Sequence, residues 1–397
     1  MTEPRDVVVV GAGPAGAAMA LFLRQQGHDV VVLDEARFPR DKVCGEGISP
    51  EAWRLLEALG AAPSVRALRP HPLRGMTLVA PDGTSFTGTY GPAREPGFAL
   101  RREAFDAALL GRVRAAGIEL QEKTRATGLV VEDGRVRGVT VENGLGPKML
   151  RARLVVGADG RRSVVARRLR LLREHPRWRK FAVRGYWEGV EGLGEHGEMH
   201  VGGGGYCGIA PLSPSVANVS FVLDQADVAS AAGDVEGFYH RALGRWPRIR
   251  QRLTRARLLS RPRAIGPLAL EARRLSAPGA LLVGDAAGFY DPFTGEGVTL
   301  ALRSAEIAAA VIDRALRSDR TGDLSLYDRL RHQATDHKFH LNRVIQRIVA
   351  WPDLANAVAR RLARRPDLAD RLVGIAGDFI PARTAFDARF LWDLLAG

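Results

Sequence analysis

Three glycines near the N-terminus have the spacing of a phosphate-binding turn. Gly11, Gly13 and Gly16 follow the apolar run Val7–Val10 and open a segment of good helix formers that ends at Gly27. In a strand–turn–helix unit the first glycine allows a tight turn, the second lets backbone N–H groups approach a pyrophosphate, and the third permits close packing of the helix on the strand. The sequence therefore predicts a pyrophosphate site at this turn.

An acidic residue follows at the distance that a ribose requires. A second apolar run, Val30–Leu33, ends in Asp34, about 20 residues beyond the glycines. A carboxylate in this place accepts hydrogen bonds from ribose hydroxyls. A glycine pattern by itself is weak, but strand, glycine turn, helix, strand and acid in this order are typical of the opening unit of a dinucleotide-binding domain.

Two later segments resemble those of FAD-dependent hydroxylases. Residues 154–163 (LVVGADGRRS) are similar to the ADG segment of that family, and residues 282–297, which include Asp285, are similar to its GD motif. The resemblance implies FAD as the cofactor and places Asp285 on its ribityl chain. It also implies that the helix after Gly297 directs its N–H groups at the flavin edge where negative charge gathers on reduction. We expect Asp159 to order the fold rather than to touch FAD.

The same resemblance completes the set of cofactor-binding candidates. Arg102 matches an arginine of the family that contacts the cofactor, and Arg40 either contacts the adenosine side or is solvated. The residues predicted to bind FAD are Gly11, Gly13, Ala15, Gly16, Asp34, Glu35, Arg40, Cys44, Gly45, Arg102, Gly284, Asp285, Gly295, Gly297 and Val298.

The segment FPRDKVCGEGISP at residues 38–50, with Ala287-Gly288 after the GD pair, resembles geranylgeranyl-reductase-like flavoproteins, a group that borders the flavin halogenases. In that group a Cys-Gly-x-Gly loop lies against the isoalloxazine ring. The resemblance therefore gives Cys44 the role of a proton donor or modulator beside the flavin. The alternative is a small residue packed in a tight turn. Cys44, Pro292 and Tyr206 are the predicted catalytic residues.

One strand departs from the patterns of both groups. Halogenases carry WxWxIP and prenyl reductases carry YxWxFP on the strand that faces the flavin, whereas the matching stretch here is Tyr206-Cys207-Gly208-Ile209-Ala210-Pro211. Glycine replaces the inner tryptophan, and alanine replaces the phenylalanine of the reductases. This departure disfavours halogenation and predicts a roomier pocket, in which Tyr206 either lines the wall or packs behind it.

These motifs need a parallel sheet to hold them, and the apolar runs around Val155 and Leu282 supply further buried strands,. Alternating residues that turn at Asp82-Gly83 and at Asp133-Gly134 predict two hairpins. Residues 182–223 are glycine-rich and β-like, and helical periodicity dominates after Ser304. We predict an α/β fold with a doubly wound, Rossmann-like FAD-binding domain (1–70, 98–175 and 265–320), an interleaved β-rich substrate domain (71–97 and 176–264) and C-terminal helices (321–397).

Composition excludes several classes of protein. Hydrophobic residues make up 46% of the 397 residues and charged residues 26%, which is ordinary for a globular protein and unlike a disordered chain. Two cysteines cannot build a disulfide framework. With no long apolar run and no signal-peptide pattern at the N-terminus, we expect a cytoplasmic protein without an integral membrane span.

The net charge of +14 comes almost entirely from arginines that are spread along the chain. Nucleic-acid binders cluster their basic residues, so we expect no nucleic-acid partner. The run Arg360–Arg365 leaves peripheral contact with an anionic membrane open. We expect no metal site, because Glu195, His196, Glu198 and His200 lie in a glycine-flanked run and His332, His337 and His340 suit a solvated helix face.

The function predicted from these residues is that of an FAD-dependent oxidoreductase that takes electrons from NAD(P)H or another external donor. The first prediction is a monooxygenase that hydroxylates an aromatic or hydrophobic small molecule through a flavin hydroperoxide. The alternative is a geranylgeranyl-reductase-like reductase of carbon–carbon double bonds. A flavin halogenase and a basic protein that holds FAD without catalysis are further, weaker alternatives.

Overall fold

The computed structural model of the chain describes residues 4–91, 95–144, 146–174, 178–229, 231, 233–377 and 379–395. Its first sheet has the strand order β20–β21–β11–β1–β2–β8, in which the last five strands are parallel. These strands are β20 (Ser276–Ala277), β21 (Ala280–Leu282), β11 (Pro147–Gly157), β1 (Arg5–Val10), β2 (Val30–Leu33) and β8 (Glu119–Gln121). The predicted buried runs therefore form the centre of a parallel sheet.

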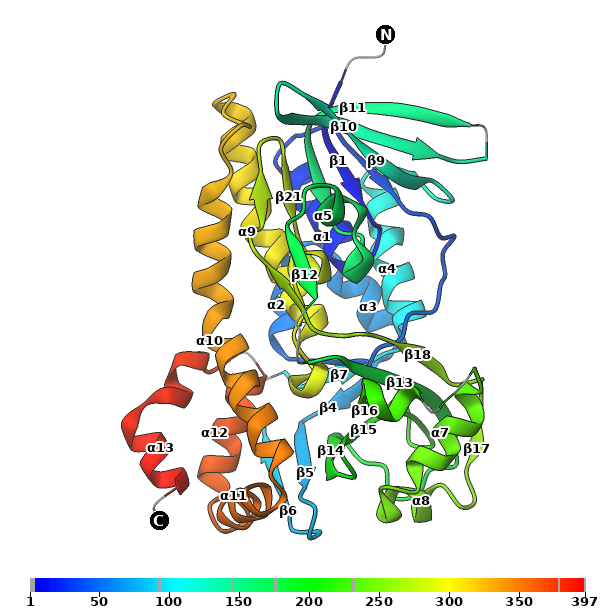
Figure 1. Ribbon diagram of the computed structural model, residues 1–397, viewed down its shortest axis with the longest axis vertical. Helices are drawn as coiled ribbons and strands as arrows, with labels where there is room; N and C mark the ends of the chain where they lie inside the picture. The colour runs from blue at the N-terminus through cyan, green and yellow to red at the C-terminus, as the bar shows by residue number, and fades with distance from the viewer. Residues whose placement is uncertain are drawn as a thin grey trace.

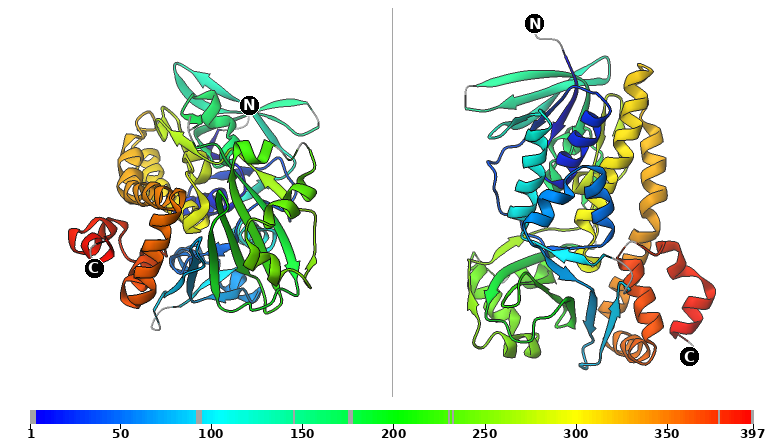
Figure 2. Two further views of the ribbon diagram at one scale, coloured as in Figure 1. Left: turned by 60° about the horizontal axis from the view of Figure 1, so that its bottom comes forward. Right: turned by 180° about the vertical axis from the view of Figure 1, so that it is seen from behind.

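Valines fill the centre of this sheet because their branched side chains pack well on a pleated surface. Val7, Val8 and Val9 are completely buried, as are most residues of β2. Helices α1 (Pro14–Gln25), α4 (Arg102–Ala115) and α9 (Gly297–Arg317) lie side by side against the sheet, as the view from behind shows (Figure 2). The α/β fold with a Rossmann-like FAD-binding part is confirmed.

Both predicted hairpins are present. β9 (Arg125–Glu132) and β10 (Arg135–Glu142) are antiparallel around Asp133-Gly134 and extend the first sheet beside β11 (Figure 1). β5 (Gly75–Val79) and β6 (Ser85–Thr89) are antiparallel around Asp82-Gly83. The prediction succeeded because Asp-Gly pairs adopt the backbone conformations of tight turns between alternating strands.

A second sheet lies below the first and joins distant parts of the chain (Figure 1). Its order is β17–β13–β16–β15–β14–β5–β6, with β18 beside β13, so that β5 pairs with a strand more than a hundred residues later. The new strands are β13 (Lys180–Glu188), β14 (His196–Gly202), β15 (Gly205–Pro211), β16 (Val216–Asp224), β17 (Arg257–Leu258) and β18 (Arg263–Ile265). The domain boundaries given above stay a prediction.

Short elements connect and cover the two sheets. The second sheet packs its Phe221 and Val183 against Tyr239 of a helical segment that follows β16. This segment consists of α6 (Gln225–Ala229), α7 (Val235–Leu243) and α8 (Pro247–Arg252). The remaining connections are α2 (Glu51–Ala58), α3 (Ala62–Ala67), α5 (Val164–Arg168), the small sheet of β3 (Gly47–Ile48), β7 (Gly97–Ala99) and β4 (His71–Leu73), and the pair β12 (Leu172–Glu174) with β19 (Leu270–Ala272).

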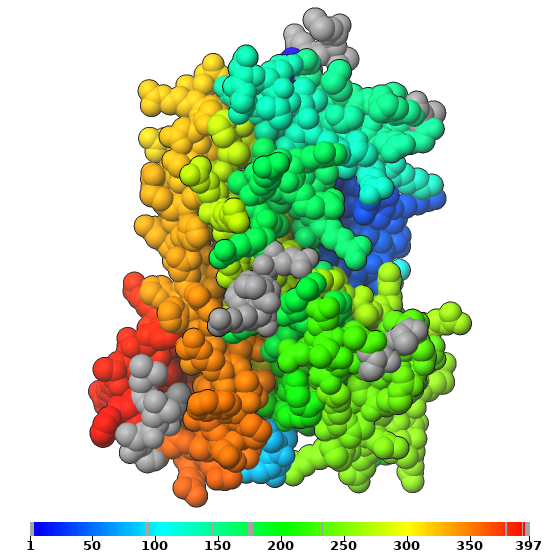
Figure 3. All heavy atoms as spheres, viewed as in Figure 1, coloured from blue at the N-terminus to red at the C-terminus, as the bar shows by residue number. Residues whose placement is uncertain are grey.

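The long helix α10 (Ser325–Ala350) runs along α9 and down to the second sheet, where α11 (Pro352–Arg364), α12 (Pro366–Ala376) and α13 (Ala388–Leu395) form a block (Figure 1 and Figure 3). α12 lies directly on β6: a Cβ on Gly88 would be 2.4 Å from the carbonyl oxygen of Ala369, and the N–H of Thr89 donates to Asp370 at 2.7 Å. No helix among the described residues has the length and apolar character that a membrane span requires.

Most arginines of the basic run Arg360–Arg365, at the end of α11, form hydrogen bonds within the protein. Arg360 bonds to Asp82 at 2.8 Å, and Arg365 bonds to Asp367 at 2.8 Å. Arg361 donates to the backbone carbonyl of Asp393 at 2.9 Å. These contacts compete with any contact to an anionic surface.

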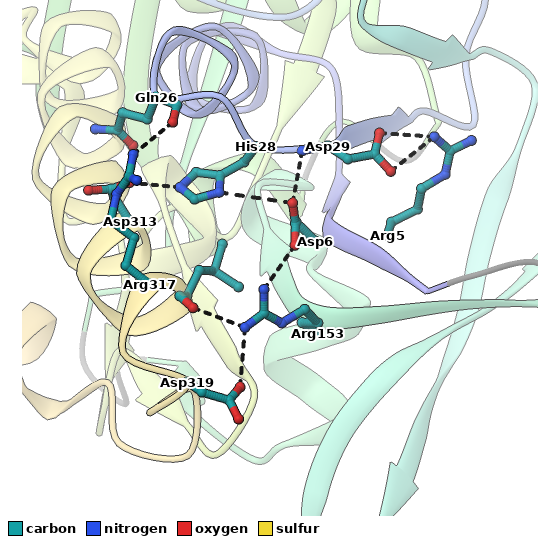
Figure 4. A network of polar contacts seen from close by, with 10 residues as sticks. Arg5, Asp6, Gln26, His28, Asp29, Arg153, Asp313, Arg317 and Asp319 are labelled. Atoms are coloured by element: carbon teal, nitrogen blue, oxygen red, sulfur yellow. Dashed lines mark hydrogen bonds and ion pairs between the residues drawn. The ribbon is translucent and has the colours of Figure 1, made fainter.

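A polar network joins strands of the first sheet at the strand ends opposite to the glycine turn (Figure 4). His28, which is 8% exposed, bonds to Asp313 of α9 at 2.8 Å. Asp6 accepts from Arg153 at 3.1 Å and from the backbone of Asp29 at 3.1 Å. The network joins β1, β2, β11 and α9. Its hydrogen bonds involve ionised side chains, and such charge-assisted bonds are stronger than bonds between neutral groups.

Candidate functional site

A cavity of about 1490 Å³ runs between the two sheets. It begins at the glycine turn and at the end of β2, passes the loop of residues 40–49, and ends among apolar side chains of the second sheet. Every predicted cofactor-binding and catalytic residue except Gly16 lines this cavity. The sequence thus located one site, although its segments are separated by hundreds of residues.

The glycine turn has the geometry that the sequence predicts. Gly11 has φ +102°, and a Cβ there would lie 2.4 Å from the carbonyl oxygen of Ala158. A Cβ on Gly16 would lie 1.8 Å from the carbonyl oxygen of Gly11, which explains why Gly16 packs helix on strand and does not reach the cavity. Gly13 faces open space, where the nearest atom to an added Cβ is a guanidinium nitrogen of Arg40 at 3.4 Å.

Asp34 is fixed by the backbone around it. Its Oδ2 accepts from the N–H of Ala12 at 2.8 Å, and its Oδ1 accepts from the N–H of Ala36 at 2.8 Å. Each oxygen keeps a second lone pair for a ligand hydroxyl. Glu35 is largely exposed and lies 3.5 Å from Arg125, so it borders the mouth of the cavity.

Two helix N-termini open onto the cavity without a side-chain cap. Neither Gly13 at the start of α1 nor Glu296 at the start of α9 provides a capping hydrogen bond. The first N–H groups of a helix lack partners within the helix and carry a partial positive charge. Both termini can therefore bind negative charge, one near the glycine turn and one at Gly297 and Val298.

The carboxylate of Asp285 lies against a lysine that the motif did not indicate. Lys42 Nζ is 3.1 Å from Asp285 Oδ2. Burial alone would raise the pKa of Asp285, but the ammonium of Lys42 and the guanidinium of Arg102 hold it below its ordinary value. Asp285 is therefore a charged acceptor in the wall of the cavity, next to Gly284.

Arg102 and Arg40 share one buried acid. The guanidinium of Arg102 forms two hydrogen bonds with Asp106, at 2.8 and 2.9 Å, and Arg40 lies 3.4 Å from the same carboxylate. Burial would lower the pKa of Arg102, but Asp106 and Cys44 raise it above its ordinary value. Since Arg102 is only 4% exposed, its position is set by these partners.

Cys44 is half-buried and lines the cavity. Its Sγ accepts from the N–H of Glu46 at 3.3 Å, and its carbonyl oxygen accepts from Asn218 at 2.8 Å. The loop with Gly45 is thus attached to β16 of the second sheet. Its neighbour Glu46 is completely buried, a feature that no motif indicated.

The far end of the cavity is apolar. Tyr206, Gly208 and Ala210 alternate along β15 and line it together, as expected for one face of a strand. The other residues of this wall are Phe181, Ala182, Met199, Val222, Leu268, Phe289, Pro292 and Phe293. A Cβ on Gly208 would meet only ordinary contacts, the nearest at 3.6 Å from Glu198 and Met199, so the roomier pocket stays a prediction.

Tyr206 bonds to a buried acid that lies behind this wall. Its hydroxyl donates to Asp291 at 2.5 Å, and Gln346 of α10 donates to the same carboxylate oxygen at 2.8 Å. Burial raises the pKa of Asp291, which the nearby ammonium of Lys180 opposes. Tyr206 therefore both lines the cavity and is fixed from behind.

A family model of the FAD-binding domain matches residues 5–338, well over half of the chain. The chain belongs to the FAD-binding domain family. It is an FAD-dependent oxidoreductase, and the resemblance stated from its motifs is confirmed.

Curated relatives are similar over most of their length. A digeranylgeranylglycerophospholipid reductase of Methanosarcina acetivorans is 28% identical and covers 87% of this chain and 85% of its own. A digeranylgeranylglycerophospholipid reductase 2 of Methanopyrus kandleri is 31% identical and covers 80% of this chain and 78% of its own. A menaquinone reductase of Mycolicibacterium smegmatis is 28% identical and covers 94% of this chain and 92% of its own.

Solved structures show the same architecture. A flavin-dependent halogenase, CmlS, superposes with a TM-score of 0.81 at 25% identity and covers 98% of this chain and 78% of its own. A geranylgeranyl bacteriochlorophyll reductase-like protein of Thermoplasma acidophilum has a TM-score of 0.75 at 21% identity and covers 99% of this chain and 97% of its own. The latter comparison shows the fold alone.

The cavity of this FAD-binding chain fits the cofactor. Open backbone at Gly13 and the uncapped start of α1 suit a pyrophosphate, and the remaining lone pairs of Asp34 suit a ribose,. Asp285 and the start of α9 follow along the same wall. The residues that would hold FAD thus line one cavity, and the assignment of each to a part of the cofactor stays a prediction.

Proposed function

We propose that the protein reduces carbon–carbon double bonds in molecules with long apolar chains, of the prenyl type. The single observation that carries this proposal is the arrangement of the cavity, in which Cys44 lines the same space as the cofactor-binding residues and an apolar wall, on a loop bonded to Asn218 of the second sheet. The names of the relatives, a reductase of a digeranylgeranyl lipid and a menaquinone reductase, support the same substrate class.

In this proposal the apolar wall binds the chain and excludes water from it. Burial of methylene and methyl groups against residues such as Phe293 and Leu268 is worth about 0.8 kcal/mol per CH₂. FAD, held by the residues described above, would supply a hydride to one carbon of the double bond when it is reduced. The thiol of Cys44 would give its proton to the other carbon and then recover a proton from solvent.

The electrons come from outside this chain. We propose NAD(P)H or another external two-electron donor that binds transiently at the arginine-rich mouth of the cavity, where Arg162 and Arg167 lie near the cofactor-binding turn. Guanidinium groups bind phosphate oxygens and carboxylates well.

Hydroxylation of an aromatic substrate is the second candidate. The observation that favours it is the aromatic character of the wall, where Phe293 and Tyr206 meet edge to face at 5.0 Å between ring centroids. Such rings also suit a flat substrate ring.

Product analysis separates the two candidates. The FAD-loaded protein is reduced chemically without oxygen, given a geranylgeranyl lipid, and the product is examined by mass spectrometry. We expect a gain of two hydrogen atoms for each double bond that is reduced. A product that forms only in air and gains one oxygen atom would show the hydroxylase instead.

Gly208→Glu tests where the substrate binds. The added Cβ meets only ordinary contacts, and residue 208 lines the apolar end of the cavity, so the variant places a charge against a bound apolar chain. We expect kcat/KM for a prenyl substrate to fall about five- to 150-fold, the equivalent of about 1–3 kcal/mol for a polar group left without a partner in apolar surroundings. FAD content and its visible spectrum should stay unchanged.

Gly111→Glu is the matched control, because a Cβ on Gly111 in α4 has nothing within 4 Å, and Gly111 is exposed and does not line the cavity. Equal activity of the parent and the Gly208 variant would place the substrate elsewhere.

A further inference from the structure

Two tyrosines among the described residues line the cavity, and their hydroxyl groups differ in one respect. The hydroxyl of Tyr206 donates to Asp291 at 2.5 Å. The hydroxyl of Tyr90 has no hydrogen-bond partner among the described residues, although Tyr90 is only 8% exposed. Buried polar groups are nearly always hydrogen-bonded, because leaving one unpaired in apolar surroundings costs free energy. An unpaired hydroxyl in the wall of a cavity therefore indicates a partner that the protein itself does not supply.

The ring of Tyr90 is held in one place by its neighbours. The backbone N–H of Tyr90, which follows β6, donates to the carbonyl oxygen of Arg74 at 2.8 Å. The ring meets that of Phe379 edge to face at 5.6 Å between ring centroids. A Cβ on Gly377 would lie 2.8 Å from Cε1 of Tyr90. This close packing covers the sides of the ring, so the hydroxyl is directed at the cavity by the protein and not by a ligand.

The surroundings of this hydroxyl are apolar and lie near the loop of residues 40–49. Leu73 and Met76 line the cavity together with Tyr90, and the three residues belong to one hydrophobic cluster. A Cβ on Gly47, shortly after Cys44, would touch Leu73 at 3.5 Å. A ligand atom bonded to Tyr90 would therefore lie on the side of the cavity that holds this loop.

Tyr90 acts as a hydrogen-bond donor at this position. Burial and the negative charge of Glu296 at the start of α9 both raise the pKa of Tyr90, so that its hydroxyl keeps its proton. Lys338 of α10 bonds to Glu296 at 2.9 Å, and no cation among the described residues bonds to the Tyr90 hydroxyl. A neutral acceptor, such as an ether or carbonyl oxygen, therefore suits Tyr90 better than a phosphate, which binds best to cations.

Other hydroxyl groups around this part of the cavity are bonded to the protein or lie elsewhere in the second sheet. Ser49 shares a hydrogen bond of 2.7 Å with Thr299. Ser220 lines the cavity from β16, where it is paired with Gly208 of β15. Since β14 and β5 separate β15 from β6, Ser220 and Tyr90 lie in different parts of the wall.

We propose that Tyr90 is a specificity-determining residue that donates a hydrogen bond to a neutral oxygen at the head of the substrate's apolar chain. This inference rests on the proposed reduction of prenyl double bonds and names the polar group that such a substrate carries. The hydrogen bond fixes the head of the chain beside Leu73, while the rest of the chain lies along the apolar wall.

Two ligands that differ at one position measure this hydrogen bond. One is geranylgeranyl methyl ether, and the other is the hydrocarbon in which a methylene group replaces the ether oxygen. Both are titrated into the oxidised, FAD-loaded protein, and binding is followed by flavin fluorescence. We expect Tyr90→Phe to bind the ether about two- to tenfold more weakly than the parent, the usual effect of one hydrogen bond between neutral groups, and to bind the hydrocarbon at least as well.

Ser220→Ala is the matched control, because it also removes a hydroxyl from the cavity wall. It should leave the ratio of the two affinities at the value of the parent. Thermal unfolding without a prenyl ligand gives a second readout. Because the Tyr90 hydroxyl has no partner within the protein and the ring contact with Phe379 is kept, Tyr90→Phe should unfold at or above the temperature of the parent.

An unchanged affinity ratio in Tyr90→Phe overturns the proposal, as does an equal change in Ser220→Ala or a lower unfolding temperature of Tyr90→Phe. Weaker FAD binding by Tyr90→Phe also overturns it, because the hydroxyl would then bond to the cofactor. If the parent binds neither ligand, both this proposal and the proposed function are wrong. A changed ratio in a protein that reduces no prenyl double bond leaves the assignment of Tyr90 standing and removes the proposed function, whereas reduction with an unchanged ratio does the reverse.

Discussion

Cys44→Ser is expected to lower kcat by a factor on the order of 10²–10⁴, the usual contribution of a positioned acid or base. Serine is almost isosteric and can keep the backbone contacts of the loop, but its hydroxyl is a far weaker acid than a thiol. FAD should stay bound, because the predicted pyrophosphate and ribityl contacts lie at Gly13 and Asp285. Steady-state rates with a prenyl substrate, together with the flavin absorbance, provide the measurement.

Cys207→Ala is the matched control. Cys207 lies on the opposite face of β15 from Tyr206 and Gly208, in the core of the second sheet. It should cost stability but leave the rate of the folded enzyme near that of the parent. A Cys44→Ser protein with unchanged turnover and unchanged flavin potential would leave Cys44 with a packing role only.

Asp285→Ala should weaken FAD binding about ten- to 150-fold. The change removes a hydrogen bond to a charged acceptor, worth about 1.5–3 kcal/mol, and leaves Lys42 without its partner at 3.1 Å. The measurement is equilibrium titration of the FAD-free protein with FAD, followed by flavin fluorescence.

Two variants isolate the cause. Lys42→Met removes the ion pair but keeps the carboxylate, so it should affect binding less than Asp285→Ala if the carboxylate bonds to the ribityl chain. Asp367→Ala removes an exposed acid that pairs with Arg365 and should have no effect on FAD, because such surface pairs are worth little. Equal FAD affinity of the parent and Asp285→Ala would refute the assignment of the GD motif.

Local patterns predicted most of the fold. The valine runs around Val8 and Val31 indicated buried parallel strands, and the Asp-Gly pairs indicated the hairpins, because each depends on neighbours in the sequence. The cofactor-binding cavity could be predicted for the same reason: its motifs are short, and Gly11, Asp34 and Asp285 lie where strands of a parallel sheet end, at the edge where such sheets bind ligands.

The polar contacts behind the cavity could not be predicted in this way. Glu46 meets Tyr186 and Asn218 only because the second sheet brings residues far apart in the sequence together. Asp291 receives Gln346 from α10 in the same manner. A single sequence contains no signal for such pairs beyond the presence of an acid between two glycines, which a solvated turn also explains.

The contact of α12 with β6 has a consequence for how the protein is made. β6 is the last strand of the second sheet, and the backbone N–H of Thr89 on its outer edge is satisfied by Asp370, almost 300 residues later. An uncovered strand edge is a template for pairing with another chain. During synthesis this edge therefore stays open until α12 has left the ribosome, and a chain truncated before residue 366 would keep it open and be prone to aggregate.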